Sequence, residues 1–512
     1  MNGGLHWIDG VIIAIYACTT LGIGWYYGRQ QRNTDEYFVG NRAMNPFLVG
    51  VSLFATLFST ITYLSSPGEY ISHGPVILTG IVSIPIVYFI VGHLMVPVYM
   101  RHRVTSAYEL LEIKLGPDVR LLAATLFIVL RLAWMSLLIY MASTAMLEML
   151  GIGEEDEDTW LPVVVFLTGS VAIIYASIGG LRAVVITDLL QFLLLFGGAV
   201  LVIVTVTVRL GGFSWFPTSW AANWDSQPLF SLDPNVRATV FGTILSVTLW
   251  WIGTAGSDQT AIQRFMSTGD AKAARRSFLI NSIAGAMVTL VLAMVGFSLL
   301  GFFQSDPDLL PEGQTLEEAA DRLFPHYISH HIPVGISGLI VSGLFAAAMS
   351  SIDSGVNSIS AVVITDFVDR FRSRPISEKA HVLAAKVLAF GIGVIVVIVS
   401  SFVMKHVPGN FLEMAQRISN LLVSPIFIMF FMALFVPFAT SRGTIAGVIF
   451  GSFAAIIAAY WKPLIGFLEV EPRYLKEISF QWIQPVAFVT SLAVACTVSL
   501  FDRLISRGRD AR

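Results

Sequence analysis

The chain has 512 residues, of which 55% are apolar and 13% charged, whereas soluble proteins carry about 25% charged residues. This composition excludes an ordinary soluble fold. The net charge of -3 at pH 7 gives no basic surplus of the kind that binds nucleic acid, and the two cysteines, Cys18 and Cys496, lie near opposite ends of the chain and indicate neither a disulfide framework nor a metal site.

Long apolar runs recur along the whole chain. A helix needs about 20 mostly apolar residues to cross a bilayer, because hydrocarbon offers no partner for a free backbone N–H or C=O group. The first run has no basic segment before it and no small-residue cleavage site after it, so we interpret it as a retained helix. We therefore expect an all-α integral membrane protein with about thirteen spans, over residues 7–27, 46–72, 76–100, 119–150, 160–178, 184–209, 239–262, 277–303, 333–365, 381–404, 411–437, 444–462 and 480–501.

Lys and Arg are divided unevenly between the two sets of connections that these spans create. One set carries 21 of them and the opposite set carries 8. A missed or additional span would exchange the sides beyond it, so the imbalance also supports the number thirteen. Positively charged connections stay in the cytoplasm. We therefore expect a multi-pass protein of the cell membrane with its N-terminus outside, its C-terminus in the cytoplasm, and the connections 210–238 and 304–332 outside.

The second span contains a polar stretch from Ser59 to Glu69, in which hydroxyl residues precede Pro67 and Gly68. An interrupted membrane helix of this kind leaves carbonyl groups free to hold a cation and N–H groups free to hold an anion. A proline kink, with the hydroxyls bonded to the helix backbone, explains the same stretch equally well when it is taken alone.

Two charged residues fall inside or close to later spans. Arg131 lies about twelve residues into the fourth span, where it either grips a substrate carboxylate or pairs with an internal acid, and we favour the pair. Gly179 and Gly180 predict a tight turn between the fifth and sixth spans, which places Asp188 about a turn and a half into the sixth. Asp188 is then either a cation ligand or a salt-bridge partner.

A second interrupted span follows five spans after the first. The stretch from Trp250 to Gln259 is rich in glycine and tryptophan, and Gln263 and Arg264 come just after it. Two broken helices at corresponding places in two five-helix halves are typical of transporters with inverted repeats. Packing notches for the glycines and an interfacial belt for the tryptophans are the alternative, which fits Trp250 poorly. Near a central site, the tryptophans would shape a solute cavity.

The ninth span is the most polar of all. Ser350, Asp353, Ser354 and Asn357 share one helix face at helical spacing, beside small residues that allow close packing. Oxygen ligands alone suit a hard cation such as Na⁺, whereas a transition metal would need His or Cys, so we expect no transition-metal site. A small-residue packing face would explain the serines but does not require the carboxylate of Asp353.

The chain as a whole resembles the sodium:solute symporter family, which contains the sodium–glucose, proline, iodide, monocarboxylate and sialic acid cotransporters. The likeness covers nearly all of the chain. It rests most strongly on the stretch from Tyr175 to Ala183, which is similar to the Gly-Gly signature of the family, followed by Asp188 and Gln191. Further matching stretches are Tyr108–Gly116, Ser59–Tyr70, Asp258-Gln259 and Gln263-Arg264.

The resemblance implies a LeuT-type fold with a 5+5 inverted-repeat core. The implied parts are a first transmembrane helix and cytoplasmic loop (1–45), a first repeat (46–209), an extracellular loop (210–238), a second repeat (239–438), and two C-terminal helices with a short cytoplasmic tail (439–512). It also implies a main sodium site formed by backbone carbonyls and two hydroxyls, at Ala55, Phe58, Ala347, Ser350 and Ser351. A second cation site would use Asp188, Ser350, Asp353 and Ser354.

At Asp353 this chain has a carboxylate where the family has a hydroxyl. Two carboxylates at one place either bind Na⁺ more strongly or force one of them to hold a proton. The number of sodium ions per cycle, and proton coupling, therefore stay open.

The solute contacts implied by the resemblance are Ser59, Thr62, Arg131, Trp251 and Thr254. Thr62 stands where sugar-transporting members have Gln, and Thr254 where they have a gating Tyr, so these positions do not support a galactose-like sugar. Sialic acid members place a carboxylate-binding Arg at the position of Trp134, one turn after Arg131. Arg131 is thus a hint of an anionic substrate.

We therefore expect a sodium-coupled secondary active symporter that imports a small organic solute by alternating access. The solute would be a sugar, a sialic acid or another carboxylate, and the partners would be the solute, sodium ions and the lipid bilayer, with no nucleic acid and no obligate protein partner. The alternatives are a proton-coupled or sodium-independent transporter, a channel, or a membrane-embedded enzyme. We expect no enzyme, because the nine histidines are scattered and no catalytic residues are indicated.

Overall fold

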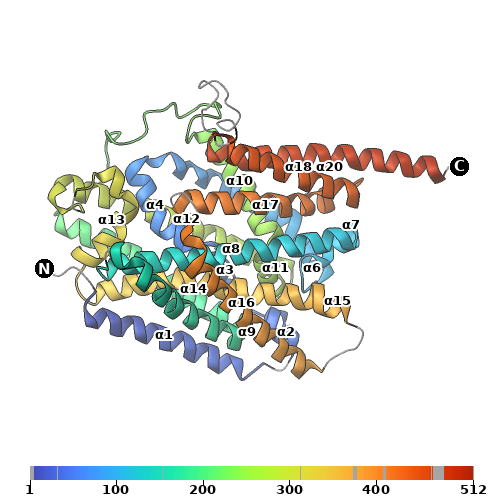
Figure 1. Ribbon diagram of the computed structural model, residues 1–512, viewed down its shortest axis with the longest axis horizontal. Helices are drawn as coiled ribbons and strands as arrows, with labels where there is room; N and C mark the ends of the chain where they lie inside the picture. The colour runs from blue at the N-terminus through green and yellow to red at the C-terminus, as the bar shows by residue number, and fades with distance from the viewer. Residues whose placement is uncertain are drawn as a thin grey trace.

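The computed structural model describes residues 5–31, 33–152, 154–311, 313–372, 377–406, 411–462, 464 and 478–510. All regular secondary structure in these ranges is helical. Figure 1 shows long, roughly parallel helices, with the N-terminus at the end of the bundle that holds α13 (Leu316–His331) and the C-terminus at the opposite end. The connection 465–477 and some of the counted charges, such as Arg32, Arg374, Arg473 and Lys476, lie outside the described residues.

Each expected span has a counterpart among the described helices. Ten helices are long and apolar enough to cross a membrane, and the bent pair α3–α4 makes an eleventh span. The 56-residue helix α9 covers two expected spans, and α17 covers the remaining one. In chain order the spans are α1 (Trp7–Gly28), α3 (Pro46–Leu57) with α4 (Thr60–Ser72), the run Pro75–His102, α8 (Pro117–Met149), α9 (Glu154–Arg209), α10 (Val240–Ser257) with α11 (Gln259–Met266), α12 (Ala271–Ser305), α14 (Ile336–Val362), α16 (Glu378–Phe402), α17 (Phe411–Phe435), α18 (Ser441–Ala459) and α20 (Phe480–Asp510).

Side-chain caps fix where many of these helices begin. Asn45 caps α3 by accepting from Phe47 N at 2.8 Å, and Pro46 occupies the first helical position, where its missing N–H costs nothing. Hydroxyl and carboxylate side chains cap other helices in the same way, and these residues are Ser59, Thr239, Asp258, Asp270, Ser377 and Thr440. The helix boundaries therefore follow from local sequence as well as from hydropathy.

Helix α14 forms the centre of the bundle. In the membrane-spanning part of Ile336–Phe371, 89% of the residues are buried inside the protein, against 22% for α1 at the periphery. Helices α18 and α20 pack against each other along one side, and α20 extends beyond the other helices at the C-terminal end (Figure 1). The most polar span is thus the one most shielded from lipid, as the cost of polar groups in hydrocarbon requires.

The second span is interrupted, but not at the proline. Helix α3 ends at Leu57 and α4 begins at Thr60, and the two are bent by 64°. Helix α4 then continues through Pro67 and Gly68 to Ser72. The expectation of a broken helix is correct, whereas the association of the break with Pro-Gly is wrong. The break lies instead at Ser59, whose hydroxyl caps the start of α4.

The connection 304–332 contains a helix that we did not predict. Helix α13 begins with a capping box between Thr315 and Glu318 and buries Leu323, Phe324 and Ile328. Its mean hydropathy is too low to register as a span, so a search for membrane segments misses it. The helix packs against α4 at the end of the bundle that also holds the N-terminus.

The predicted tight turn at Gly179-Gly180 is a kink within α9. Gly180 has φ 59° and ψ -172°, a conformation that side chains rarely adopt. A Cβ atom there would lie 2.9 Å from the Tyr37 carbonyl oxygen, because the short helix α2 (Thr34–Val39) packs against the kink. The Tyr37 hydroxyl donates to the carbonyl of Ser177 at 3.1 Å. The kink thus redirects the chain and anchors α2.

We expect Gly180→Ala to destabilise the protein, because a backbone with φ 59° and ψ -172° alone costs about 1–3 kcal/mol for a residue with a Cβ. Gly197→Ala is the matched control on the same helix, since a Cβ there meets nothing within 4 Å. The measurement is the midpoint of thermal unfolding of the purified protein. A midpoint as high for Gly180→Ala as for Gly197→Ala would contradict the assignment of strain to the kink.

Candidate functional site

The break between α3 and α4 exposes backbone carbonyls in the middle of the bundle. Phe58 and Ser59 are extended, with ψ angles of 120° and 161°. The last carbonyls of α3 therefore lack the N–H partners that a continuous helix would supply. The Ser59 hydroxyl caps the new helix through Thr62 N, although at 3.4 Å this contact is long. Unpaired carbonyls in a buried place need another partner.

Two hydroxyls of α14 supply that partner. Ser350 Oγ donates to the carbonyl of Ala55 at 2.8 Å and lies 3.1 Å from the carbonyl of Ala347. Ser351 Oγ donates to the carbonyl of Thr56 at 3.2 Å. Ala55, Phe58, Ala347 and both serines are each at most 5% exposed. The structure thus brings the Ser350 hydroxyl to the carbonyls of Ala55 and Ala347, as expected, and the Ser351 hydroxyl to the carbonyl of Thr56, which was not among the expected ligands. Hydroxyls and carbonyls form the ligand set of a hard cation.

The residues of the expected second cation site surround a guanidinium group. Arg264 donates through Nη2 to the Ser354 hydroxyl, and the same Nη2 lies 3.4 Å from Asp188 Oδ2. Arg264 Nε donates to Ser52 Oγ at 2.8 Å, and Ser52 Oγ donates to Asp188 Oδ2 at 2.5 Å. All of these side chains are fully buried. Asp188 is therefore the salt-bridge partner of an arginine in this conformation, which is one of its two expected roles.

Asp353 is held by neutral groups. The Tyr175 hydroxyl donates to Asp353 Oδ2, and the Ser354 hydroxyl donates to Oδ1 at 2.9 Å. Ser354 also bonds Thr56 Oγ1 at 2.8 Å, which links this cluster to the end of α3. Ser350 makes its bonds to Ala55 and Ala347 rather than to either carboxylate. The cluster contains two carboxylates and one guanidinium.

Arg131 pairs with an internal acid. Its Nη2 lies 2.5 Å from Asp258 Oδ2, and the two side chains are 6% and 5% exposed. Asp258 lies at the break between α10 and α11, where its other oxygen caps Thr260 N at 2.8 Å. The ion pair therefore joins α8 to the second broken helix. This is the interpretation that we favoured for Arg131 over a substrate-binding role.

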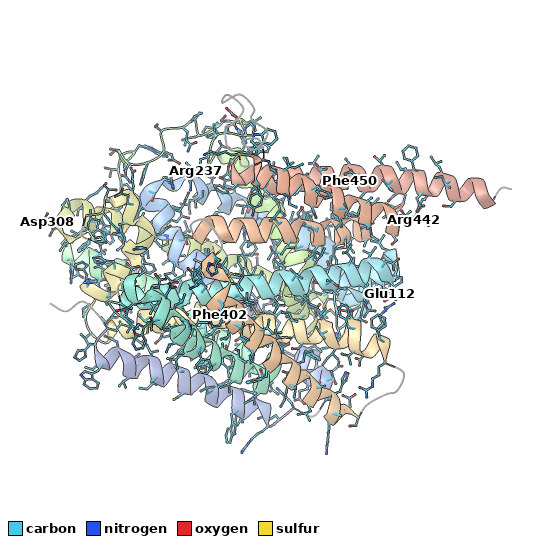
Figure 2. All side chains as sticks on the ribbon, in the orientation of Figure 1. Glu112, Arg237, Asp308, Phe402, Arg442 and Phe450 are labelled. Atoms are coloured by element: carbon cyan, nitrogen blue, oxygen red, sulfur yellow. The ribbon has the colours of Figure 1, made fainter. Side chains whose placement is uncertain are left out.

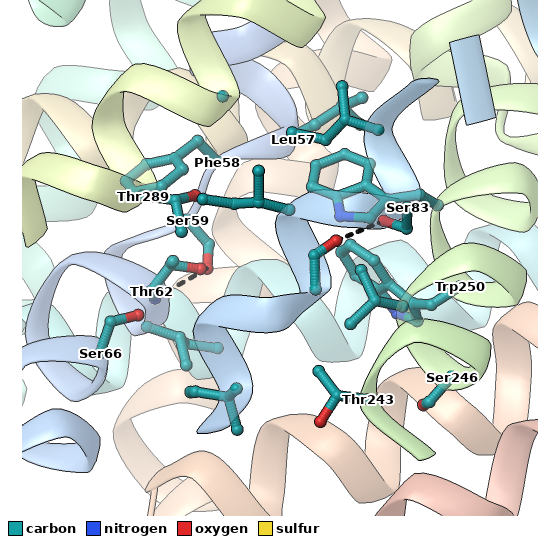
Figure 3. Close-up of a pocket in the computed structure, with 18 of the residues that line it drawn as sticks. Leu57, Phe58, Ser59, Thr62, Ser66, Ser83, Thr243, Ser246, Trp250 and Thr289 are labelled. Carbon is teal, nitrogen blue, oxygen red and sulfur yellow. Dashed lines mark hydrogen bonds between the residues drawn. The ribbon is translucent and has the colours of Figure 1, made fainter. Parts of the chain in front are cut away.

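A cavity of about 310 Å³ lies beside the first break. Ser59, Thr62 and Trp251 of the expected solute contacts line it, and Figure 3 shows Ser59 and Thr62 at its edge with Trp250 across from them. Arg131 and Thr254 are not among its lining residues. Trp134, where the resemblance places a carboxylate-binding Arg in sialic acid members, also lines it. The sequence did not point to several other lining groups, which share no motif and lie on α10, α12 and α20: Ser246, Asn281, Ser282, Thr289 and Gln481.

Glu69 is the one charged side chain among the described residues that line this cavity. Arg237, from the connection 210–238, donates to both of its carboxylate oxygens, at 2.7 and 2.8 Å. Burial, with the charge of Glu69 second, raises the pKa of the neighbouring Asp321 on α13. The cavity therefore runs from the helix break to a charged cluster at its mouth, which no local sequence signal identified.

Ion pairs gather at the opposite end of the bundle. Arg120 lies 2.5 Å from Asp366 and 2.6 Å from Glu112, and Arg370 lies 2.6 Å from Glu112. The bonds from Arg370 and Arg120 lower the pKa of Glu112. Figure 2 shows Glu112 on the side of the bundle far from Asp308, with Arg237 in the upper part of the view. The pairs tie the segments that hold Glu112, Arg120 and Asp366 together on that side.

Broken helices at a buried cluster of oxygens, beside a cavity lined by several spans, are typical of membrane transporters that work by alternating access. Comparison with known proteins shows the family of transporters to which the chain belongs. The sequence model of the family "Sodium:solute symporter family" matches residues 37–451, and the chain belongs to this family. It is accordingly a multi-pass, sodium-coupled solute symporter.

Several relatives match over most of the chain. The sodium/sialic acid symporter SiaT of Proteus mirabilis is 28% identical over 472 residues, covering 89% of this chain and 90% of its own length. The sodium-coupled monocarboxylate transporter 2 of Homo sapiens is 27% identical over 471 residues, covering 91% of this chain and 73% of its own length.

Solved structures establish the fold. The substrate-bound, outward-open structure of a Na⁺-coupled sialic acid symporter has a TM-score of 0.81 at 24% identity, covering 97% of this chain and 98% of that one. The transporter MhsT, in complex with L-phenylalanine, has a TM-score of 0.52 at 12% identity, covering 89% of this chain and 98% of its own. These likenesses establish the expected LeuT-type fold.

The Arg131–Asp258 pair allows a test of its structural role. Asp258→Asn should destabilise the protein by about 3–5 kcal/mol, because it leaves Arg131 buried without a counter-charge while preserving the oxygen that caps α11. Arg131→Met/Asp258→Asn removes both charges and should recover much of that loss. The measurement is the thermal unfolding midpoint of both variants. A double variant no more stable than Asp258→Asn would count against the pair.

Proposed function

We propose that this symporter binds one Na⁺ at the carbonyls of Ala55, Phe58 and Ala347 and the hydroxyls of Ser350 and Ser351, and that it binds a small solute without net negative charge in the adjoining cavity. The observation that carries the proposal is the contact of the two serine hydroxyls with the carbonyls freed by the break. Na⁺ would take the place that hydroxyl hydrogens now occupy at those carbonyls.

The break couples the two ligands in this proposal. Ala55 and Thr56 face the ion on the α3 side, and Ser59 and Thr62 line the cavity on the α4 side. An ion that fixes the end of α3 also fixes the start of α4, so each ligand favours the arrangement that the other needs. Rocking of the two repeats would then expose both ligands at the opposite end.

Arg264 is the reason why we propose one Na⁺ per chain rather than two. Its guanidinium already contacts Asp188 and Ser354, two of the groups expected at the second cation site. A permanent positive charge there offsets one carboxylate and leaves less electrostatic gain for a second Na⁺. We propose that Arg264 serves as a tethered cation, so that the main site alone gives the sodium dependence.

The lining of the cavity supports the class of solute. Three tryptophans, Trp134, Trp250 and Trp251, supply aromatic faces, while hydroxyls and amides supply hydrogen bonds. The charged group among its described lining residues is a carboxylate, Glu69, which repels an anion except where Arg237 shields it. By name, the relatives described above transport sialic acid or monocarboxylates. In this chain Arg131, the arginine considered for a substrate carboxylate, is already paired with Asp258.

The conformation is outward-facing in this proposal. The charge count of the connections assigns the end with α13 and 210–238 to the outside, and the cavity reaches Glu69 and Gln481 toward that end. The ion pairs of Glu112, Arg120 and Asp366 close the cytoplasmic end and must separate for release. The cell membrane is the proposed location.

Removal of the two hydroxyls tests the ion site. In Ser350→Ala/Ser351→Ala, uptake into proteoliposomes should need at least about tenfold more Na⁺ for half-maximal rate, since two of five ligands are lost. Ser360→Ala is the control, because this serine also lies buried on α14 but bonds the Val356 carbonyl of its own helix. Wild-type uptake should rise with Na⁺ with a Hill coefficient near 1. Unchanged sodium dependence in the double variant would overturn the site.

Matched pairs of solutes test the solute class. Purified protein in Na⁺ is mixed with glucose or glucuronate, lactamide or lactate, and N-acetylmannosamine or sialic acid, and thermal stabilisation is measured. We expect that a neutral member of a pair stabilises the protein and that its acid does not. The described lining of the cavity has no cationic side chain, and Arg237 nearby is already paired with Glu69. Stabilisation by the acids alone would refute the solute class and leave the sodium site standing.

A further inference from the structure

A second cavity, of about 220 Å³, lies at the end of the bundle opposite α13. Three separate connections meet there: the segment Gly40–Arg42, the residues after helix α6 (Val96–His102), and the turn between α11 and α12. Met44 N donates to the carbonyl of Ser267 at 3.0 Å and ties the first connection to the third. The cavity is therefore built by segments from both repeats, away from the solute cavity.

The backbone at this cavity is strained. In the described part of the chain, three residues other than glycine have positive φ: Asn41 at 57°, Arg42 at 55° and Arg103 at 48°. All three line this one cavity. Left-handed backbone is uncommon for residues with a Cβ, and where the fold retains it the site often clamps a ligand. The strain therefore marks the cavity as more than a packing gap.

The charges at the cavity lack partners. Neither Arg42 nor Arg103 forms an ion pair with a carboxylate of the described residues, and Arg42 Nη1 is buried without any hydrogen-bond partner there. Asp270, the nearest acid along the third connection, uses its side chain to cap α12 through Ala273 N at 2.7 Å. A buried guanidinium nitrogen with no acceptor is costly, so an acceptor from outside the chain is expected.

We propose that this cavity binds a phosphate-bearing anion between Arg42 and Arg103. Guanidinium groups match phosphate oxygens in pairs, and the Asn41 side-chain amide adds a neutral donor. The volume exceeds the roughly 30 Å³ of one water several-fold, which leaves room for a phosphate group. The charge count places the cavity at the cytoplasmic face, where both soluble phosphates and anionic phospholipid headgroups are available.

The test measures thermal unfolding of the purified full chain with soluble probes. Dioctanoyl phosphatidylglycerol is compared with dioctanoyl phosphatidylcholine, and glycerol 3-phosphate and inorganic phosphate with sodium chloride at equal ionic strength. Stabilisation by phosphatidylglycerol alone assigns the anion to a lipid, and stabilisation by the free phosphates as well assigns it to a soluble ligand. Absence of stabilisation by any phosphate probe overturns the proposal.

Variants locate the binding. Arg42→Ala/Arg103→Ala should raise the half-maximal probe concentration at least about tenfold, whereas the control Arg101→Ala/Lys272→Ala, which removes the same charge from the same face but not from the cavity lining, should leave it unchanged. If the first variant does not fold, Arg42→Lys/Arg103→Lys keeps both charges but loses the paired donors, and should weaken binding several-fold. Equal weakening by the control pair would overturn the site.

Discussion

The structure depends on one constraint: a membrane helix that stops at Leu57 and restarts at Thr60 leaves carbonyls that hydrocarbon cannot satisfy. The hydroxyls of Ser350 and Ser351 satisfy the carbonyls of Ala55 and Thr56, which requires α14 to lie against the break. Helix α14 is in turn the most deeply buried span. The central position of the polar helix and the cluster of buried oxygens at which we propose the ion site are thus consequences of the same break.

Buried ion pairs are the second feature that fixes the arrangement of the helices. Arg264 lies between Asp188 and the hydroxyls of Ser52 and Ser354, and Arg131 pairs with Asp258 at the other broken helix. Arg264 links α11 to α9, and Arg131 links α8 to the break between α10 and α11. Breaking such a pair costs more than its formation contributes, because the remaining charge is stranded. The pairs therefore hold these helices in register rather than add much net stability.

The sequence predicted what depends on hydrophobic length and on local backbone preferences. The spans followed from apolar runs, and the kink at Gly180 followed from paired glycines, because only glycine adopts φ 59° at little cost. Helical spacing placed Ser350 on a polar face suited to a hard cation, whereas Ser351 was named only by resemblance to a family. The location of that break was missed because Pro67 is the stronger local signal, although α4 accommodates it.

Other features lay beyond any local pattern. The partner of Arg131 is 127 residues away in sequence, and that of Glu69 is 168 residues away. Helix α13 was missed because a hydropathy search does not register a polar helix. The wall of the cavity beside the first break combines residues from α4, α10 and α12 with single residues or pairs from helices such as α8 and α20. Only the assembled bundle places such groups together.

Coupling of ion and solute through the break can be measured by equilibrium binding of ²²Na⁺ to the purified protein, with and without a solute that stabilises it. We expect about one Na⁺ per chain, and a sodium affinity that the solute raises by the same factor by which Na⁺ raises the affinity for the solute. Sodium binding that is indifferent to saturating solute would contradict this coupling.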